Sequence, residues 1–244
     1  MFSRKEVGAF FICAVVLTII FGFNDGAETF IFLNWFNNML MVLFVVLICM
    51  VVYVFAQKVA AKSFNAFTVF KVWKISRFRV AHKKLNLKNK EAVPLGILVG
   101  ILLALLSFGK AFWTGIWSND VDYKSHKRVG RDKIVITEYE TAKIIFAGPA
   151  ALIVFSVILT WFLNAGYNVE FVRNVAFLIG FINMIPLPGM DGSRVFFSSK
   201  MMWVFGAIFM FLSFGLRYLG VFGNIIMSTI AALMLLAIYY YRWE

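Results

Sequence analysis

The sequence predicts an all-α integral membrane protein. Of its 244 residues, 62% are hydrophobic, and the mean hydropathy of +0.85 is far above that of an ordinary soluble domain. Several apolar stretches approach or exceed the roughly 18–20 residues with which a helix crosses a bilayer. The net charge is +12, and ten of the 24 basic residues lie between Lys58 and Lys90, directly after one such stretch. This concentration is typical of a cytoplasmic loop that contacts anionic lipid headgroups.

The same charge distribution argues against a nucleic-acid-binding protein, because the basic residues gather beside a predicted span. We therefore expect the lipid bilayer as a partner, with anionic headgroups contacted by segment 58–90, and no nucleic acid. We find no internal repeat, low-complexity tract or Pro/Ser-rich linker. The sequence thus predicts a single polytopic membrane domain over 1–244.

Six transmembrane helices are expected. The first apolar stretch lacks a small-residue cleavage site, so we interpret it as a retained helix rather than a signal peptide. Arg4 and Lys5 precede it, whereas the first loop carries Asp25 and Glu28, which places the N-terminus in the cytoplasm. An even number of spans then returns the C-terminus, with Arg242, to the same side. The expected spans are 8–23, 31–56, 141–163, 171–187, 200–216 and 221–240.

Segment 94–117 is long enough to cross the bilayer once, but a crossing creates a conflict. It would place residues 120–143, with six basic and five acidic side chains, outside the cell. It would also separate Tyr53 from Asp191 by the thickness of the membrane. A re-entrant hairpin with a break near Gly109 and Lys110 removes both conflicts. Lys110 would then face a wet or protein-lined side of the hairpin.

A short membrane-associated β segment is expected within 70–80. From Lys74 onward, polar and apolar residues roughly alternate, which is the period of a strand with one apolar face. Phe and Trp beside Lys and Arg suit the headgroup region. An amphipathic interfacial helix is the alternative.

The cysteines and histidines indicate neither a disulfide nor a metal site. Cys13 and Cys49 both fall within apolar helices, where we expect buried, unpaired thiols. His82 and His126 lie far apart in basic segments, and neither has a second histidine at the i+4 position that would complete a pair of ligands on one helical face. A zinc site built from these two residues is therefore not expected.

A ten-residue segment at 183–192 reads Asn-Met-Ile-Pro-Leu-Pro-Gly-Met-Asp-Gly and lies between apolar stretches. Pro186 and Pro188 remove backbone donors and prevent a continuous helix, and Gly189 permits a bend. A helix interrupted at membrane depth directs its freed backbone groups towards protein or a cavity rather than lipid. We expect Asn183 to hydrogen-bond carbonyl groups of its own broken helix.

Asp191, near the end of this segment, has two interpretations. An aspartate within a membrane is costly and normally marks a functional site. However, Asp191 lies near the predicted cytoplasmic face, is followed by Arg194, and could simply cap the next helix. Both interpretations remain open from the sequence.

Two further motifs precede this segment. Residues 147–150 read Ala-Gly-Pro-Ala, and residues 53–58 read Tyr-Val-Phe-Ala-Gln-Lys, followed by Ala60-Ala61-Lys62. In their order and spacing, the three motifs resemble the site-2 protease family of intramembrane zinc metalloproteases. The resemblance covers roughly 33–197 and implies a site-2-protease-like core. In that family, a His-Glu-x-x-His motif stands where this chain has residues 53–57, and an aspartate matching Asp191 is the third zinc ligand.

The resemblance implies that the catalytic centre has been lost. Tyr53 and Gln57 replace the two histidines, and a phenol with a pKa near ~10 and a neutral amide are poor zinc ligands at neutral pH. Val54 replaces the glutamate that acts as general base. A catalytic zinc requires three protein ligands, and only Asp191 of the family's set survives. We therefore predict no metal, no cofactor and no catalytic residues.

The replacements are expected to contact each other. Tyr53 and Gln57 are at i and i+4 and share one helical face. We hypothesise that they form a buried hydrogen-bonded cluster with Asp191 in place of the metal. The alternative is that Tyr53 anchors the helix at the membrane interface while Gln57 faces water.

The function predicted from the resemblance is that of a pseudoprotease. It would bind or scaffold transmembrane partners, such as single-span helices, or regulate membrane proteolysis. The predicted partner groove contains five residues: Gly148, Pro149, Asn183, Pro186 and Pro188. Alternatives are a channel or transporter, and an active metalloprotease with non-standard ligands. The compact chain favours the plasma membrane of a prokaryote, more specifically an archaeon.

Overall fold

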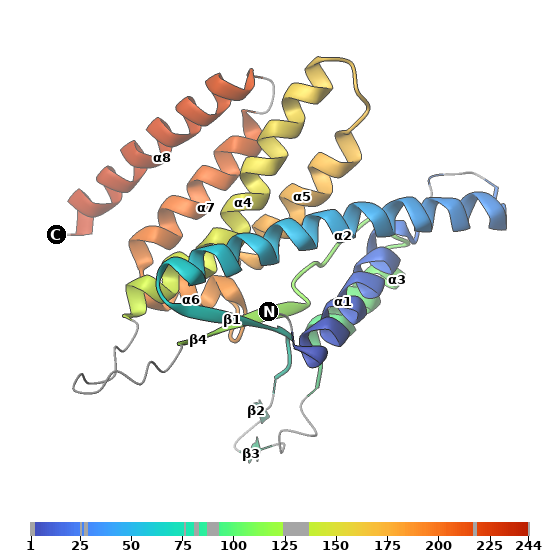
Figure 1. Cartoon of the computed structure of the whole chain (residues 1–244), viewed down its shortest axis with the longest axis horizontal. Coiled ribbons are helices and arrows are strands. Elements are labelled where there is room, and N and C mark those ends of the chain that lie inside the picture. Colours follow the sequence, from blue (N-terminus) through green and yellow to red (C-terminus); the bar gives the residue numbers. More distant parts are fainter. Residues whose placement is uncertain are drawn as a thin grey trace. The chain divides into compact units, whose positions relative to one another are not determined.

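The computed structural model describes residues 3–24, 26, 29–75, 77–80, 83–86, 93–123, 137–216 and 219–243. The described chain is mostly helical (Figure 1). Its elements are α1 (Arg4–Gly22), α2 (Phe32–Ser63), β1 (Ala66–Val72), β2 (Arg77–Val80), β3 (Lys83–Asn86), α3 (Leu95–Leu106), β4 (Trp117–Tyr123), α4 (Glu138–Asn164), α5 (Glu170–Asn183), α6 (Asp191–Ser198), α7 (Lys200–Gly215) and α8 (Val221–Trp243). The chain divides into two compact units, residues 1–48 with 69–120 and residues 49–68 with 121–244.

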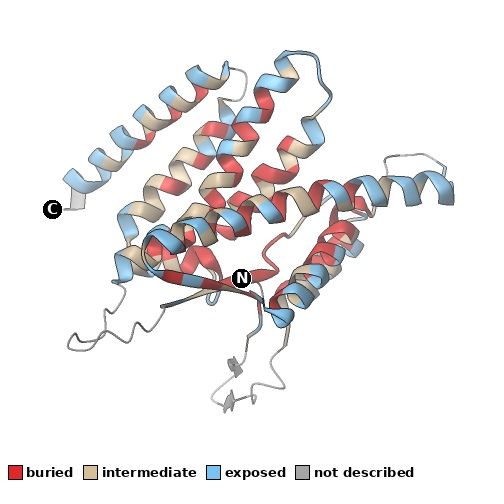
Figure 2. Cartoon of the chain, in the orientation of Figure 1, coloured by how far each residue is buried: buried red, intermediate tan, exposed pale blue. Residues whose placement is uncertain are grey.

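Within the described residues, four helices are long and apolar enough to cross a membrane: α1, α2, α4 and α8. Helices of this length and composition identify a membrane protein. Their outward faces carry many exposed apolar side chains, most evidently along α8 (Figure 2). The other two predicted spans correspond to shorter helices, since α5 has 14 residues and α7 has 16. The number of crossings therefore stays a prediction.

In the first unit, α3 is followed by a chain reversal. The helix ends at Leu106, and a turn containing Phe108 and Gly109, both with positive φ, leads into an extended segment. That segment returns along α3, because a Cβ built on Gly96 would lie 2.4 Å from the Gly115 carbonyl oxygen. The Trp73 amide donates to the Ile116 carbonyl at 2.9 Å, so the chain returns to the level at which it entered α3. The break expected near residues 109–110 thus coincides with this turn.

Strand β1 pairs with β4 in a two-stranded sheet. Buried residues alternate with more exposed ones along β1, as expected of a strand with one covered face. Lys71 and Asp120 form an ion pair between the two strands, and the Phe70 amide donates to the Glu6 carboxylate at 3.0 Å. The β segment predicted within 70–80 is present, but β1 begins earlier, at Ala66, and its partner β4 was not foreseen.

Strands β2 and β3 form a separate antiparallel pair. Arg77–Val80 is therefore extended, and the alternative of an amphipathic helix at these residues is wrong. The alternation that begins at Lys74 identified this strand correctly.

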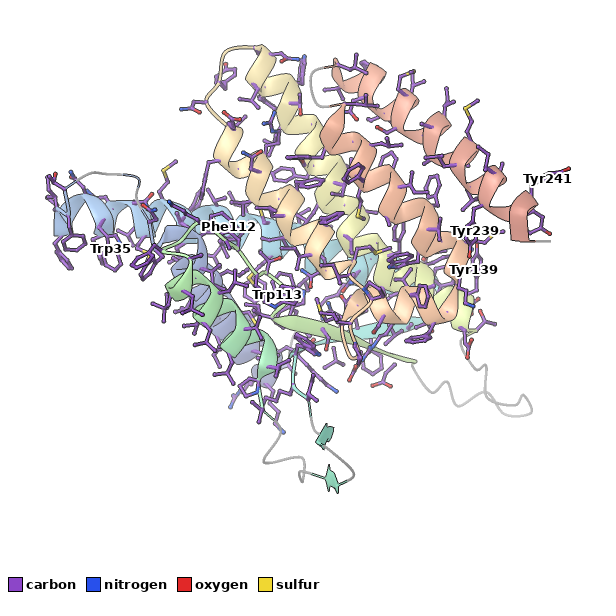
Figure 3. The ribbon with its side chains drawn as sticks, turned by 180° about the vertical axis from the view of Figure 1, so that it is seen from behind. Trp35, Phe112, Trp113, Tyr139, Tyr239 and Tyr241 are labelled. Atoms are coloured by element: carbon purple, nitrogen blue, oxygen red, sulfur yellow. The ribbon has the colours of Figure 1, made fainter. Side chains whose placement is uncertain are left out.

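The second unit is built around α4, which contacts α5, α6, α7 and α8. The C-terminal ends of α4 and α7 lie at the same end of this unit as the N-terminal ends of α5 and α8 (Figure 1). Tyr139 near the start of α4 lies towards the opposite end, as do Tyr239 and Tyr241 near the end of α8 (Figure 3). The Lys143 ammonium is 4.4 Å from the centre of the Tyr139 ring. Tyrosines and a lysine grouped in this way are typical of a membrane–water interface.

The thiols of Cys13 and Cys49 are both buried and unpaired. This arrangement confirms the expectation of small hydrophobic residues without a disulfide.

Candidate functional site

The aspartate segment forms a sharp connection between α5 and α6. Helix α5 ends at Asn183, earlier than the predicted 187, because Pro186 and Pro188 cannot continue the helical hydrogen bonds. Gly189 adopts a φ of +88°, a conformation that glycine tolerates best. The Asn183 side-chain amide donates to the carbonyl of Ile179, four residues earlier, at 2.9 Å. The expected bond of Asn183 to its own helix is therefore present.

Gly192 allows α6 to begin directly against the end of α5. A Cβ at this position would lie 2.3 Å from the Met184 carbonyl, so no larger residue fits without a shift of the backbone. The indole Nε1 of Trp203 in α7 donates to the same Met184 carbonyl at 2.8 Å. Backbone approach and side-chain capping together fix the position of Asp191.

Asp191 is the first residue of α6 and is fully buried. Met190 occupies the N-cap position, and no side-chain capping bond is present there, so Asp191 does not cap α6 in the usual manner. A carboxylate in the first turn is nevertheless favoured by the partial positive charge of a helix N-terminus.

Helix α2 presents two donors to this carboxylate. The Tyr53 hydroxyl donates to Asp191 Oδ2 at 2.7 Å, and Gln57 Nε2 donates to the same oxygen at 3.1 Å. Both side chains have no solvent exposure. The predicted cluster of Tyr53, Gln57 and Asp191 is therefore present, and the alternative in which Tyr53 lies at the interface and Gln57 faces water is wrong.

Helix α4 contacts the cluster at Gly148 and Pro149. Pro149 has no amide hydrogen, so the carbonyl of Ile145, four residues earlier, lacks its usual helical donor. Gln57 Nε2 supplies that donor at 2.9 Å. At Gly148, a Cβ would lie 2.8 Å from Tyr53 Cε1 and 2.9 Å from Gln57 Nε2. Gly148 thus provides the room, and Pro149 the unpaired acceptor, that this position of Gln57 requires.

The two acceptors also determine the orientation of the Gln57 amide. Because Nε2 lies between a carboxylate and a carbonyl oxygen, a flipped amide would direct its own oxygen at both of them. The oxygen Oε1 therefore points elsewhere, and it is buried without a hydrogen-bond partner. An unsatisfied buried acceptor of this kind is uncommon in proteins.

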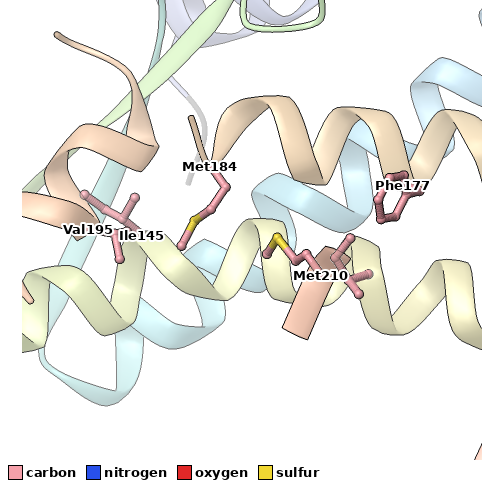
Figure 4. Close-up of a cluster of buried hydrophobic side chains, with 6 residues drawn as sticks. Ile145, Phe177, Met184, Val195 and Met210 are labelled. Carbon is pink, nitrogen blue, oxygen red and sulfur yellow. The ribbon is translucent and has the colours of Figure 1, made fainter. Parts of the chain in front are cut away.

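The helices of the second unit also share an apolar core. A core formed by Ile145, Ile153, Phe177, Met184, Val195 and Met210 packs α4, α5, α6 and α7 together (Figure 4). A desolvated carboxylate is costly unless donors satisfy it. The two donors from α2 meet this requirement for Asp191.

The residues present do not fit a catalytic zinc. Val54 is buried, and its side chain cannot accept a proton. Asp191 is the one carboxylate of the cluster, and its Oδ2 already accepts two hydrogen bonds from side chains that are poor zinc ligands. Across the described parts of the chain, no three His, Cys, Asp or Glu side chains lie close enough together to hold a metal ion. His82 and His126 lie outside the described residues.

The five predicted groove residues lie in two different environments. Gly148, Pro149 and Asn183 are buried, whereas Pro186 and Pro188 are exposed. Gly148 and Pro149 support the cluster, Asn183 bonds within α5, and the two prolines lie at the surface. The prediction from the sequence omitted the Ile145 carbonyl and Trp203. The position of Pro149, four residues after Ile145, is a signal that could have identified the first of these.

No family model, no curated protein and no solved structure matches this chain.

Proposed function

We propose that this protein is a catalytically inactive, site-2-protease-like membrane protein that binds or scaffolds transmembrane partners or regulates membrane proteolysis. The observation that supports the proposal best is the convergence of Tyr53, Gln57 and Asp191. These are the three positions at which the resemblance places zinc ligands. An i, i+4 pair on one helix meets an aspartate 138 residues away in the sequence, and neutral donors occupy the places of the imidazoles.

The spacing within the cluster supports a scaffold that once suited a metal. Zinc ligands at about 2.0–2.1 Å in a tetrahedral arrangement lie about 3.3 Å from each other. The donor atoms of Tyr53 and Gln57 lie 2.7 Å and 3.1 Å from Asp191 Oδ2. These two distances are close to ligand spacing, and an imidazole at position 57 has about the same reach as the Gln57 side chain.

The double variant Tyr53→His/Gln57→His tests whether the cluster occupies a former zinc site. We expect the purified variant to bind close to one equivalent of zinc, measured by elemental analysis after dialysis, while the wild-type protein binds much less. Adding Asp191→Asn serves as the matched control and should remove most of the gained zinc. Zinc binding that is equal with and without Asp191 would contradict a common ligand site.

The scaffolding role is tested by photocrosslinking in native membranes. Phe197 in α6 is 76% exposed and lies on the helix that begins with Asp191, whereas Phe222 in α8 is 82% exposed. A benzoylphenylalanine at either position replaces one phenylalanine by another aromatic residue. We expect a membrane-protein adduct from position 197 and none from position 222, identified by mass spectrometry. Adducts with lipid alone at both positions would contradict the proposal of a membrane-protein partner. Ion or solute flux in proteoliposomes would favour a transporter instead.

A further inference from the structure

A second buried polar site lies in the second unit, between α4, α5 and α7. It is a cavity of about 10 Å³. Its polar lining consists of Ser156, Thr160, Arg173 and Ser213, and the rings of Phe177 and Phe214 cover it with their centroids 4.3 Å apart. None of these residues belongs to the cluster around Asp191, so the two sites are separate.

The cavity has a positive wall. The Arg173 side chain is only 10% exposed. Its Nη2 donates to the Glu170 carboxylate at 3.2 Å and to Asn174 Oδ1 at 3.4 Å, but the Glu170 side chain is 61% exposed to the surroundings. No acidic residue lines the cavity itself. A cation buried among apolar helices is costly and normally marks a functional site.

A hydroxyl group of the cavity wall lacks a partner. Ser213 Oγ is buried and makes no hydrogen bond, although a serine in a helix commonly donates to the carbonyl four residues earlier. Thr160 does donate in this way, to the Ser156 carbonyl at 3.2 Å. The backbone carbonyl of Ser213 accepts from Asn224 Nδ2 in α8 at 2.9 Å. Ser213 therefore brings an unused donor to the cavity and links it to the contact between α7 and α8.

The size of the cavity determines the class of ligand. A volume of about 10 Å³ leaves room for only one small particle, such as a water molecule or a monatomic ion. Phosphate, sulfate and organic carboxylates are too large, and the guanidinium of Arg173 disfavours a cation. We propose that this cavity binds a single halide ion, chloride under cellular conditions, held by Arg173 and the Ser213 hydroxyl.

The proposal is tested by thermal unfolding of the full-length protein in detergent. Chloride or bromide is exchanged for gluconate at constant sodium concentration and ionic strength, because gluconate cannot enter the cavity. A ligand that binds the folded state raises the unfolding midpoint with its concentration. We expect this rise for the wild type, and we expect Ser213→Ala to weaken the apparent halide affinity about tenfold, since a hydrogen bond to a charged group is lost.

Thr229→Ala is the matched control, because this hydroxyl bonds within α8 and does not line the cavity. Its halide response should equal that of the wild type. If Ser213→Ala does not fold, Ser213→Thr replaces it as the test, and this variant should retain the halide response because it keeps the hydroxyl group. Anomalous diffraction from bromide-soaked crystals should place the ion beside Arg173. Equal midpoints in chloride and gluconate, an unchanged affinity in Ser213→Ala, or a water molecule without bromide in the cavity would each overturn the proposal. None of these outcomes depends on the proposed pseudoprotease function.

Discussion

At the scale of single residues, burial of the Asp191 carboxylate has a desolvation cost that hydrogen-bond donors must offset. Asp191 is fully buried, and Tyr53 and Gln57 supply the two side-chain hydrogen bonds to Oδ2. Both donors are neutral, so they stabilise the carboxylate without adding a second charge to the core. Loss of either donor leaves part of the desolvation cost of Asp191 uncompensated.

We therefore expect Tyr53→Phe to destabilise the protein by about 1–3 kcal/mol, the usual effect of leaving a buried charged acceptor short of a donor. The substitution removes only the hydroxyl and keeps the ring that packs against Gly148. Chemical or thermal unfolding in detergent measures the change. Tyr139→Phe is the control, because the Tyr139 side chain is more than half exposed and its loss should change stability little. Equal effects of the two substitutions would show that the bond to Asp191 contributes nothing.

At the scale of elements, the contact of α2 with α4 depends on a hydrogen bond that is missing within α4. Pro149 leaves the Ile145 carbonyl without a helical donor, and Gln57 from α2 replaces it at 2.9 Å. The sequence predicted that Tyr53 and Gln57 share a helical face, because this follows from the helical period alone. It did not predict the role of α4, because the pairing of a proline-freed carbonyl with a residue 88 positions away leaves no local pattern.

A double-mutant cycle tests this coupling. Gln57→Leu alone leaves both Asp191 and the Ile145 carbonyl short of a donor and should destabilise the protein by about 2–6 kcal/mol, the sum of two such losses. Pro149→Ala supplies a new amide donor to Ile145. In that background, Gln57→Leu should cost about 1 kcal/mol less, a coupling typical of residues that share a partner. Additive effects in the unfolding free energy would contradict the proposed exchange of donors.

At the scale of the whole molecule, the ends of segment 94–117 return to neighbouring parts of the chain. The pairing of β1 with β4 and the Trp73–Ile116 hydrogen bond place the residues before α3 next to those after it. The sequence predicted this reversal from the charge distribution and from the expected proximity of Tyr53 and Asp191, rather than from local structure. We therefore predict that both flanks of α3 lie on one side of the membrane.

Cysteine labelling in vesicles of known orientation tests this arrangement. In a background carrying Cys13→Ala and Cys49→Ala, we expect Lys74→Cys and Asp122→Cys to react with a membrane-impermeant maleimide from the cytoplasmic side. Tyr167→Cys, in the exposed connection between α4 and α5, should react from the opposite side. Labelling of positions 74 and 122 from opposite sides would mean that segment 94–117 crosses the bilayer.

The sequence by itself determined the features that depend on composition and on neighbours along the chain. Apolar length predicted the long helices, two prolines predicted a break in the helix within 183–192, and an alternating pattern predicted the strand at 77–80. Only the tertiary structure decided which distant groups lie together. Gln57 bonds the Ile145 carbonyl, β1 pairs with β4, and Arg173 and Ser213 line one cavity. The physical reason is that helix and strand periods are local properties, whereas the satisfaction of a buried polar group depends on packing between segments far apart in the chain.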